Sequence, residues 1–198
     1  MQAARGTSLS DENDATPESP ATTHRSGHLR LRFAAIALVV YLVDLGTKIV
    51  AVDELADRDV ALIGDFLVLH LTRNPGAAFS TGTQFTEVLS VIAIVALVVV
   101  LWLSRRLGSA GWATAFGFLL AGVAGNLTDR IFREPGPLRG HVIDFLMLPN
   151  WPVFNVADVA INVAAGLILV QAFRGIRIDG TREGADESQQ PEPEANHT

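Results

Sequence analysis

Two short runs of the sequence each place an aspartate beside a stretch that is apolar enough to cross a membrane. One is GHVIDF at Gly140–Phe145, which carries Asp144, and the other is FNVADVAIN at Phe154–Asn162, which carries Asp158. A carboxylate near lipid is energetically costly and is rarely without a function. Two carboxylates that can meet are suited to acid–base chemistry on one water molecule, because one can hold a proton while the other is ionised.

Four apolar stretches can position these aspartates in a bilayer, since a helix needs roughly 20 residues to cross the hydrocarbon core. We therefore predict an all-α polytopic membrane protein with four transmembrane helices, at Phe33–Val52, Phe85–Leu103, Trp112–Phe132 and Val153–Phe173. The alternative is that these stretches are buried helices of a soluble protein. The apolar run at Val88–Leu103 argues against that alternative.

The polar residues are concentrated at the two ends of the chain, and this defines the domain organisation. Residues 1–30 and the acidic residues 176–198 contain too little apolar surface to fold alone, so we predict two disordered cytoplasmic tails. Residues 31–175 form the predicted membrane domain. No apolar region with a cleavage site precedes the first span, so the N-terminus is not read as a secretory leader.

Arginines near the spans predict the orientation of the helices, because cytoplasmic loops are enriched in Arg and Lys. Three segments share this enrichment and fall on one side of a four-span protein, so both termini are predicted to be cytoplasmic. The loops at 53–84 and 133–152 then face outward and bring Asp129, Asp144 and Asp158 to the outer face. The arginines concerned are Arg25, Arg30, Arg32, Arg105, Arg106, Arg174 and Arg177.

The first outer loop has the pattern of short strands at about 56–84. Apolar side chains alternate along Phe66–Thr72, Asn74–Gly76 forms a turn sequence, and Ala77–Phe79 is suited to a returning strand. Val142–Leu148 is a further candidate for extended structure. We therefore predict a small extracytoplasmic β-sheet over the outer face of the helices.

Charged and amide side chains recur at helical spacing within the spans. Asp44 and Lys48 are four residues apart and share a face, either as a self-neutralising pair or as a support for the site. Asn126, Asp129 and Arg130 share a face of another span. We expect Asp129 to pair with Arg130 and to be structural.

Asp144 and Asp158 differ from Asp129 because neither has a cation close by in the sequence. Asp158 also belongs to a polar stripe with Asn155 and Asn162 on the fourth span. These two aspartates are therefore the residue-level candidates for acid–base chemistry.

The composition excludes several other kinds of site. The chain has no cysteine, which excludes disulfides and thiolate catalysis. His141 is expected to be solvated, because no cluster has the spacing of metal ligands. No phosphate-binding glycine loop and no nucleic-acid motif is present. We therefore expect no metal, no cofactor and no nucleic-acid partner.

Five motifs, in order along Phe33–Phe173, together resemble those of the lipoprotein signal peptidase family, also called signal peptidase II. The motifs are DLGTK at Asp44–Lys48, RNPGAAFS at Arg73–Ser80, GNLTDR at Gly125–Arg130, HVIDF at His141–Phe145 and FNVADVAI at Phe154–Ile161.

The resemblance implies an aspartic endopeptidase of the bacterial inner membrane. Such an enzyme removes the signal peptide from diacylglyceryl-modified prolipoproteins and cleaves just before the lipidated cysteine. It acts as a monomer in contact with membrane lipid and needs no cofactor.

The resemblance also assigns roles to individual residues. By motif, the catalytic pair falls on Asp144 and Asp158, with Asp129 as a rival for the first role. Substrate-binding positions fall on Asn74, Gly76, Arg130 and Asn155, and supporting positions on Asp44, Lys48, Asn126 and Asp129.

Two other classes of membrane protein also carry polar residues in their spans. A proton-coupled transporter has intramembrane carboxylates, but it usually shows repeats and broken helices. A membrane scaffold protein uses amides between helices, which would explain Asn126 and Asn162 but not a cluster of carboxylates at one face.

Overall fold

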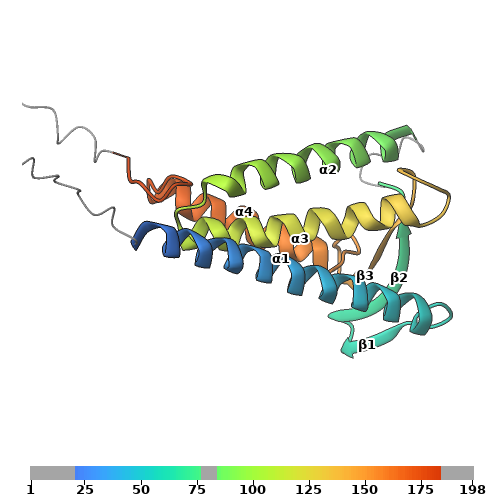
Figure 1. The fold of residues 1–198 in the computed structure, drawn as a ribbon. Helices are drawn as coiled ribbons and strands as arrows, with labels where there is room; N and C mark the ends of the chain where they lie inside the picture. The colour runs from blue at the N-terminus through green and yellow to red at the C-terminus, as the bar shows by residue number, and fades with distance from the viewer. Residues whose placement is uncertain (1–20, 77–83, 184–198) are drawn as a thin grey trace, which may run out of the picture.

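Four long helices and a small sheet at one end of them make up the structure (Figure 1), a computed structural model that describes residues 21–76 and 84–183. All four helices are long and apolar enough to cross a membrane, which confirms the predicted polytopic fold. The helices are α1 (Ala21–Glu54), α2 (Gln84–Leu103), α3 (Ala110–Phe132) and α4 (Val156–Phe173), and a short 3-10 helix, η2 (Ser104–Arg106), follows α2.

Helix α3 is the centre of the bundle and packs against each of the other three helices. Glycines on α3 permit close approach, since a side chain at Gly117 would meet α1 and one at Gly122 would meet the backbone of α4. Small residues of this kind are typical where membrane helices pack together. The other helices expose many apolar side chains, as is appropriate for helices that face lipid.

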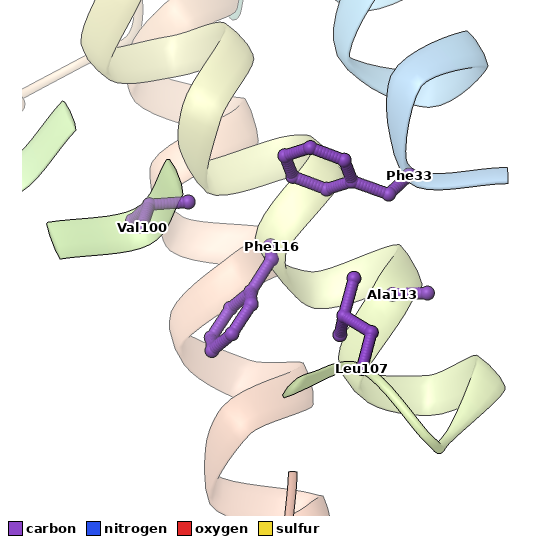
Figure 2. Close-up of a cluster of buried hydrophobic side chains, with 5 residues drawn as sticks. All are labelled: Phe33, Val100, Leu107, Ala113 and Phe116. Carbon is purple, nitrogen blue, oxygen red and sulfur yellow. The ribbon is translucent and has the colours of Figure 1, made fainter. Parts of the chain in front are cut away.

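A compact apolar cluster joins α1, α2 and α3 near the end that is distant from the sheet (Figure 2). Ala113 of α3 is a small, fully buried member of this cluster. The buried members of the cluster are Phe33, Val100, Leu107, Ala113 and Phe116.

Three antiparallel strands form the sheet, in the order β1 (Val60–Ile63), β2 (Leu67–Asn74) and β3 (Val142–Met147). Strands β2 and β3 confirm the two predicted extended segments. The predicted returning strand at Ala77–Phe79 lies outside the described residues. The register places Thr72 of β2 opposite Asp144 of β3, so the sheet directly positions one of the two candidate aspartates.

A second apolar cluster fixes this sheet to the end of α1. Ala51 and Leu55 of α1 pack with Ile143 and Phe145 of β3, and all four are buried. Asp144 lies between the two β3 residues of this cluster, on the other face of the strand. The position of Asp144 relative to α1 is therefore set by apolar packing on both sides of it.

The segments that flank the bundle differ from the predicted domain boundaries. Helix α1 begins at Ala21, ahead of the predicted start of the membrane domain. Residues 176–183 are not a free tail but turn back onto the bundle, because Ile178 O accepts from Gly108 N at 2.9 Å and Ile176 O accepts from Trp112 Nε1 at 2.8 Å. The rest of both predicted tails lies outside the described residues.

Candidate active site

Asp144 lies in the middle of β3 and is only 2% exposed. Each of its carboxylate oxygens accepts a hydrogen bond from an asparagine side chain. Asn74 Nδ2 donates to Oδ2 at 2.8 Å, and Asn155 Nδ2 donates to Oδ1 at 2.6 Å. Asn74 stands at the end of the neighbouring strand β2 and Asn155 precedes α4, so two separate elements hold this carboxyl group.

Asp158 lies in the first turn of α4, where a reciprocal cap holds it. Asn155 Oδ1 accepts from Asp158 N at 2.9 Å, and Asp158 Oδ2 accepts from Asn155 N at 3.1 Å. The second oxygen of Asp158 accepts from Asn126 Nδ2 of α3 at 2.9 Å. A helix N-terminus favours an anionic side chain, so this environment suits an ionised carboxylate.

The two aspartates belong to one hydrogen-bonded network. Asn155 caps Asp158 and also donates to Asp144, so a single fully buried side chain contacts both. Asn126 Oδ1 accepts from Asn155 Nδ2 at 3.1 Å, which orients the Asn126 amide so that its Nδ2 faces Asp158. The structure thus brings together the two candidate aspartates that stand 14 residues apart in the sequence.

A cleft of about 590 Å³ contains both aspartates. Its lining includes polar residues, Asn74 and the two aspartates, and an apolar wall made of apolar residues of α4 and of the segment before it. An aromatic side chain, Trp151, lies at the cleft and is largely exposed. The lining residues are Asn74, Asp144, Trp151, Pro152, Val153, Phe154, Asp158, Val159, Asn162 and Val163.

The environment of Asp144 favours its protonated form. Burial raises the pKa of Asp144 from 3.8 to about 6, and the negative charge of Asp158 acts in the same direction. The hydrogen bonds from Asn74 and Asn155 and the charge of Lys48 lower the pKa and partly offset this effect. Asp144 is therefore the carboxyl group of the pair that holds a proton more readily than a free aspartic acid.

A buried lysine, Lys48, is connected to Asp158 through Asn126. Lys48 Nζ contacts Asp44 Oδ2 at 2.8 Å, Asp129 Oδ2 at 2.9 Å and Asn126 Oδ1 at 3.1 Å. Lys48 and both of its carboxylate partners are at most 2% exposed. The predicted Asp44–Lys48 pair therefore exists, but it belongs to a larger buried cluster that extends to Asn126, a direct partner of Asp158.

Each carboxylate of this cluster also holds the backbone next to one of the candidate aspartates. Asp44 Oδ1 accepts from Ala157 N at 2.8 Å, directly before Asp158. Asp129 Oδ2 accepts from Ile143 N at 3.2 Å, directly before Asp144. The separation of the two aspartates thus depends on two carboxylates that Lys48 holds together.

Asp129 forms ion pairs with Lys48 and Arg133, so the predicted pairing with Arg130 is wrong. Adjacent residues on a helix point in different directions, whereas a residue four positions later lies on the same face. Arg133 satisfies this spacing and Arg130 does not. Asp129 is nevertheless ion-paired and buried, as expected for a structural carboxylate.

Arg130 instead interacts electrostatically with three carboxylates of the site. It is nine-tenths buried, and the carboxylates of Asp144, Asp129 and Asp158 all act on its guanidinium group. Among the described residues, its Nη1 atom has no hydrogen-bond partner. A buried guanidinium N–H without a partner is costly, so it is available to an acceptor on a bound substrate.

Gly76 acts on the site through Asn74. Its backbone N donates to Asn74 Oδ1 at 2.8 Å, which leaves the Asn74 Nδ2 group directed at Asp144. Gly76 has φ of 110°, and a side chain there would also collide with Leu89 of α2. Glycine is the residue best suited to this conformation.

Sequence analysis did not identify the apolar wall of the cleft or the place of Asn162 in it. Trp151 is the member that a sequence pattern could have indicated, because tryptophan is enriched at membrane interfaces. Within 21–76 and 84–183, no group of three or more His, Asp or Glu side chains is arranged to hold a metal ion.

Many known proteins are similar to this chain in sequence. The family model described as "Signal peptidase (SPase) II" matches residues 36–174. A lipoprotein signal peptidase of Leifsonia xyli subsp. xyli is 46% identical over 171 residues, covering 85% of this chain and 79% of the relative. The lipoprotein signal peptidase of Rhodococcus jostii is 44% identical and covers 91% of this chain and 92% of the relative. That of Mycobacterium tuberculosis is 46% identical and covers 82% of this chain and 79% of the relative.

A solved structure described as a bacterial membrane enzyme is also similar. It superposes with a TM-score of 0.64 at 25% identity and covers 72% of this chain and 92% of that chain.

Proposed function

Because the chain belongs to the signal peptidase II family, we propose that Asp144 and Asp158 are the catalytic pair with which it removes signal peptides from prolipoproteins. One observation carries this assignment: both aspartates line the same cleft and both carboxylates accept from Asn155, Asp144 from its side-chain Nδ2 and Asp158 from its backbone N. Asp129, the rival candidate, has its two oxygens engaged by Arg133, Lys48 and a backbone N–H. It is not among the residues that line this cleft.

The two environments suggest different roles for the two aspartates. Asp158, at the N-terminus of α4 and bonded by two N–H donors, is the ionised base that takes a proton from water. The water oxygen then attacks the scissile carbonyl carbon, while the protonated Asp144 donates its proton to the carbonyl oxygen. The tetrahedral intermediate collapses as Asp158 returns its proton to the leaving amine and Asp144 recovers its own.

The substrate we propose is a prolipoprotein whose cysteine already carries diacylglycerol, cut just before that cysteine. The apolar wall formed by Val153, Val159 and Val163 is suited to acyl chains and to an apolar signal peptide. Acyl chains that remain in the bilayer would hold the scissile bond at the depth of the pair, which reduces the entropy lost on reaction. We propose that Arg130 Nη1, which has no hydrogen-bond partner among the described residues, binds a main-chain oxygen of the peptide, and that Asn74, which lines the cleft, contacts the peptide beside Asp144.

Cleavage by the purified protein tests this function. The substrates are a diacylglyceryl-modified precursor and the same precursor without the lipid, and the products are identified by mass spectrometry. We expect the lipidated precursor to yield a fragment that begins with the modified cysteine. Cleavage at another bond, or equal cleavage of the unmodified precursor, would contradict the proposed specificity.

We also propose that the chain acts as a monomer with the cleft at the outer face of the inner membrane. All groups assigned to the reaction come from one chain. The sheet lies at one end of the helices, and the start of α1 and the segment after α4 lie at the other (Figure 1). The cleft is at the sheet end, because Asn74 of β2 and Asp144 of β3 line it. Arg30 Nη2 approaches Arg105 O at 3.5 Å at that opposite end, and arginines of this kind mark the cytoplasmic side.

Reporter fusions provide a prediction of orientation. Fusions at Asp59 and Gly136, both at the sheet end, should give the activity of a reporter that works only outside the cytoplasm. A fusion at Gly108, between α2 and α3, should give the activity of a cytoplasmic reporter. A cytoplasmic signal at Asp59 would reverse the proposed orientation.

The raised pKa of Asp144 predicts the pH dependence of cleavage. The pKa is about 6, so the proton needed for donation is present below that pH and is lost as the pH rises through it. We therefore expect kcat/KM to fall about tenfold per pH unit on the alkaline side, with a limb that begins near pH 6 in the free enzyme. Steady-state cleavage between pH 5 and 9 measures this, and return to pH 6 controls for unfolding. A profile that is flat over this range would exclude Asp144 as the general acid.

A further inference from the structure

Asn162 is a polar residue of the cleft that the proposed reaction does not use. It lies four residues after Asp158 on α4, so the two side chains share one face of the helix. Both line the same cleft. Four residues of α-helix span about 6 Å, so Asn162 lies about 6 Å further from the sheet and deeper in the spanning segment than Asp158.

The surroundings of Asn162 are apolar. Its neighbours in the lining are Val159 and Val163, and α4 as a whole is apolar enough to span a membrane. The Asn162 side chain is exposed on the surface of the protein. An amide at this depth is costly unless its polar atoms have partners.

Only part of this amide is satisfied within the protein. Asn162 Nδ2 donates to Asp158 O at 2.9 Å, a carbonyl of its own helix. In the part of the chain that the structure describes, Asn162 Oδ1 has no hydrogen-bond partner. The Asn162 amide therefore has one acceptor oxygen and one N–H left for a ligand, and the hydrogen bond to Asp158 O fixes the plane of the amide.

The free acceptor distinguishes between the possible ligands at this depth. Acyl chains have no polar groups, and the ester groups of a diacylglyceryl unit have acceptors but no donors. An extended peptide presents backbone N–H and C=O groups that lack helical partners, and both kinds match an amide side chain. The chemistry of Asn162 is therefore complementary to a peptide main chain rather than to lipid.

We propose that Asn162 binds the main chain of the signal peptide at the second or third residue before the lipidated cysteine. An extended chain rises about 3.3 Å per residue, so 6 Å from the catalytic pair corresponds to about two residues. These residues lead into the apolar part of the signal peptide, which enters the bilayer. The inference rests on the proposed function, because it presupposes a peptide whose scissile bond lies at Asp144 and Asp158.

Substrates with single N-methyl groups test the proposal, because N-methylation removes one backbone donor. The probes are diacylglyceryl-modified precursor peptides that are methylated in turn at each of the five residues before the cysteine. For the wild-type protein, methylation at the second or third residue should lower kcat/KM about tenfold, the size expected for one lost hydrogen bond between peptide and protein.

Asn162→Leu, which keeps the size of the side chain, should lower kcat/KM for the unmodified peptide by the same factor, mainly through KM. The kcat/KM of Asn162→Leu should be the same for the unmodified peptide and for the methylated peptide that the wild type cleaves more slowly. A purely structural role would reduce the activity on all peptides alike. Asn162→Ala provides a second variant with the same expected pattern.

Thr47→Val is the matched control. Thr47 is a partly exposed residue of α1 whose hydroxyl donates to carbonyls of its own helix, Val43 O and Asp44 O, and it is not among the residues that line the cleft. Its kcat/KM and its response to each methylated peptide should equal those of the wild type.

Two results overturn the proposal while wild-type cleavage continues. One is that methylation at neither the second nor the third residue changes kcat/KM of the wild type. The other is that Asn162→Leu and Asn162→Ala keep the full wild-type discrimination. If the wild type fails to cleave the unmodified lipidated peptide, the proposed function itself fails, and this outcome is distinct from the other two.

Discussion

Asp144→Asn and Asp158→Asn should each reduce the rate of the chemical step by at least about 10²–10⁴-fold, the usual contribution of general acid–base catalysis. Asparagine matches aspartate in size but can neither donate the proton to the carbonyl oxygen nor accept one from water. Both variants should remain folded and should still bind precursor, since the apolar wall of the cleft is unchanged. Single-turnover cleavage of a diacylglyceryl-modified precursor measures the effect.

Asp129→Asn is the matched control for this prediction. Asp129 is buried like Asp144, but its partners are Lys48 and Arg133 and a backbone N–H before Asp144. Its substitution should reduce folding yield or substrate binding more than the chemical step. Near-normal turnover by Asp144→Asn, together with a folded but inactive Asp129→Asn, would transfer the catalytic role to Asp129.

Lys48→Met should destabilise the fold by about 3–5 kcal/mol, because removal of one member of a buried ionic cluster leaves the other charges without compensation. The carboxylates of Asp44 and Asp129 would remain buried and would repel each other. They also hold the backbone N–H groups of Ala157 and Ile143, so the folded fraction should cleave slowly as well. Unfolding in detergent, followed by tryptophan fluorescence, measures the stability.

An exposed ion pair provides the comparison for Lys48. Arg58 and Glu54 are also four residues apart and 2.8 Å from each other, but their side chains are 65% and 60% exposed. Arg58→Met should change the stability by less than about 1 kcal/mol. Equal effects of Lys48→Met and Arg58→Met would show that the buried cluster is not important for the fold.

The double variant Asp44→Asn/Lys48→Met separates stability from positioning. It removes one positive and one negative charge, so part of the stability lost in Lys48→Met should return. Cleavage should remain slow, because the Asn126 Oδ1 atom still lacks the contact with Lys48 Nζ. Full recovery of cleavage would mean that Lys48 affects only folding and not the geometry of the pair.

The parts of the fold that depend on local spacing could be predicted from the sequence. Apolar runs of sufficient length predicted all four helices, and alternation of apolar residues predicted β2. Asp44 and Lys48 could be paired because four residues of helix place them on one face. The predicted pairing of Asp129 with Arg130 was wrong because adjacent residues of a helix point in different directions. Arg133, four residues after Asp129, has the spacing that places both on one face.

Contacts between distant segments could not be predicted from spacing. Lys48 and Asn126 are 78 residues apart, and Asn74 and Asp144 are 70 residues apart, so their contacts depend on the packing of α1 on α3 and of β2 on β3. The spacing of Asn155 and Asp158 suits a reciprocal helix cap, but nothing local to Asn155 indicates that its side chain also donates to Asp144. Strand β1 lies within the outer loop for which short strands were predicted, but its bounds were not, because it forms by pairing with β2. The turn after α4 was missed because it depends on a contact with Trp112.

Hydrolysis in ¹⁸O-labelled water tests the central claim, that Asp144 and Asp158 activate a water molecule for direct attack on the scissile bond. The purified protein is mixed in excess with a diacylglyceryl-modified precursor for a single turnover, and the products and the enzyme are then analysed by mass spectrometry. We predict one ¹⁸O atom in the new carboxyl terminus of the signal peptide and none in the enzyme peptides that contain Asp144 and Asp158. A label in either aspartate, or a signal peptide released without label, would show that a carboxylate and not water attacks the substrate.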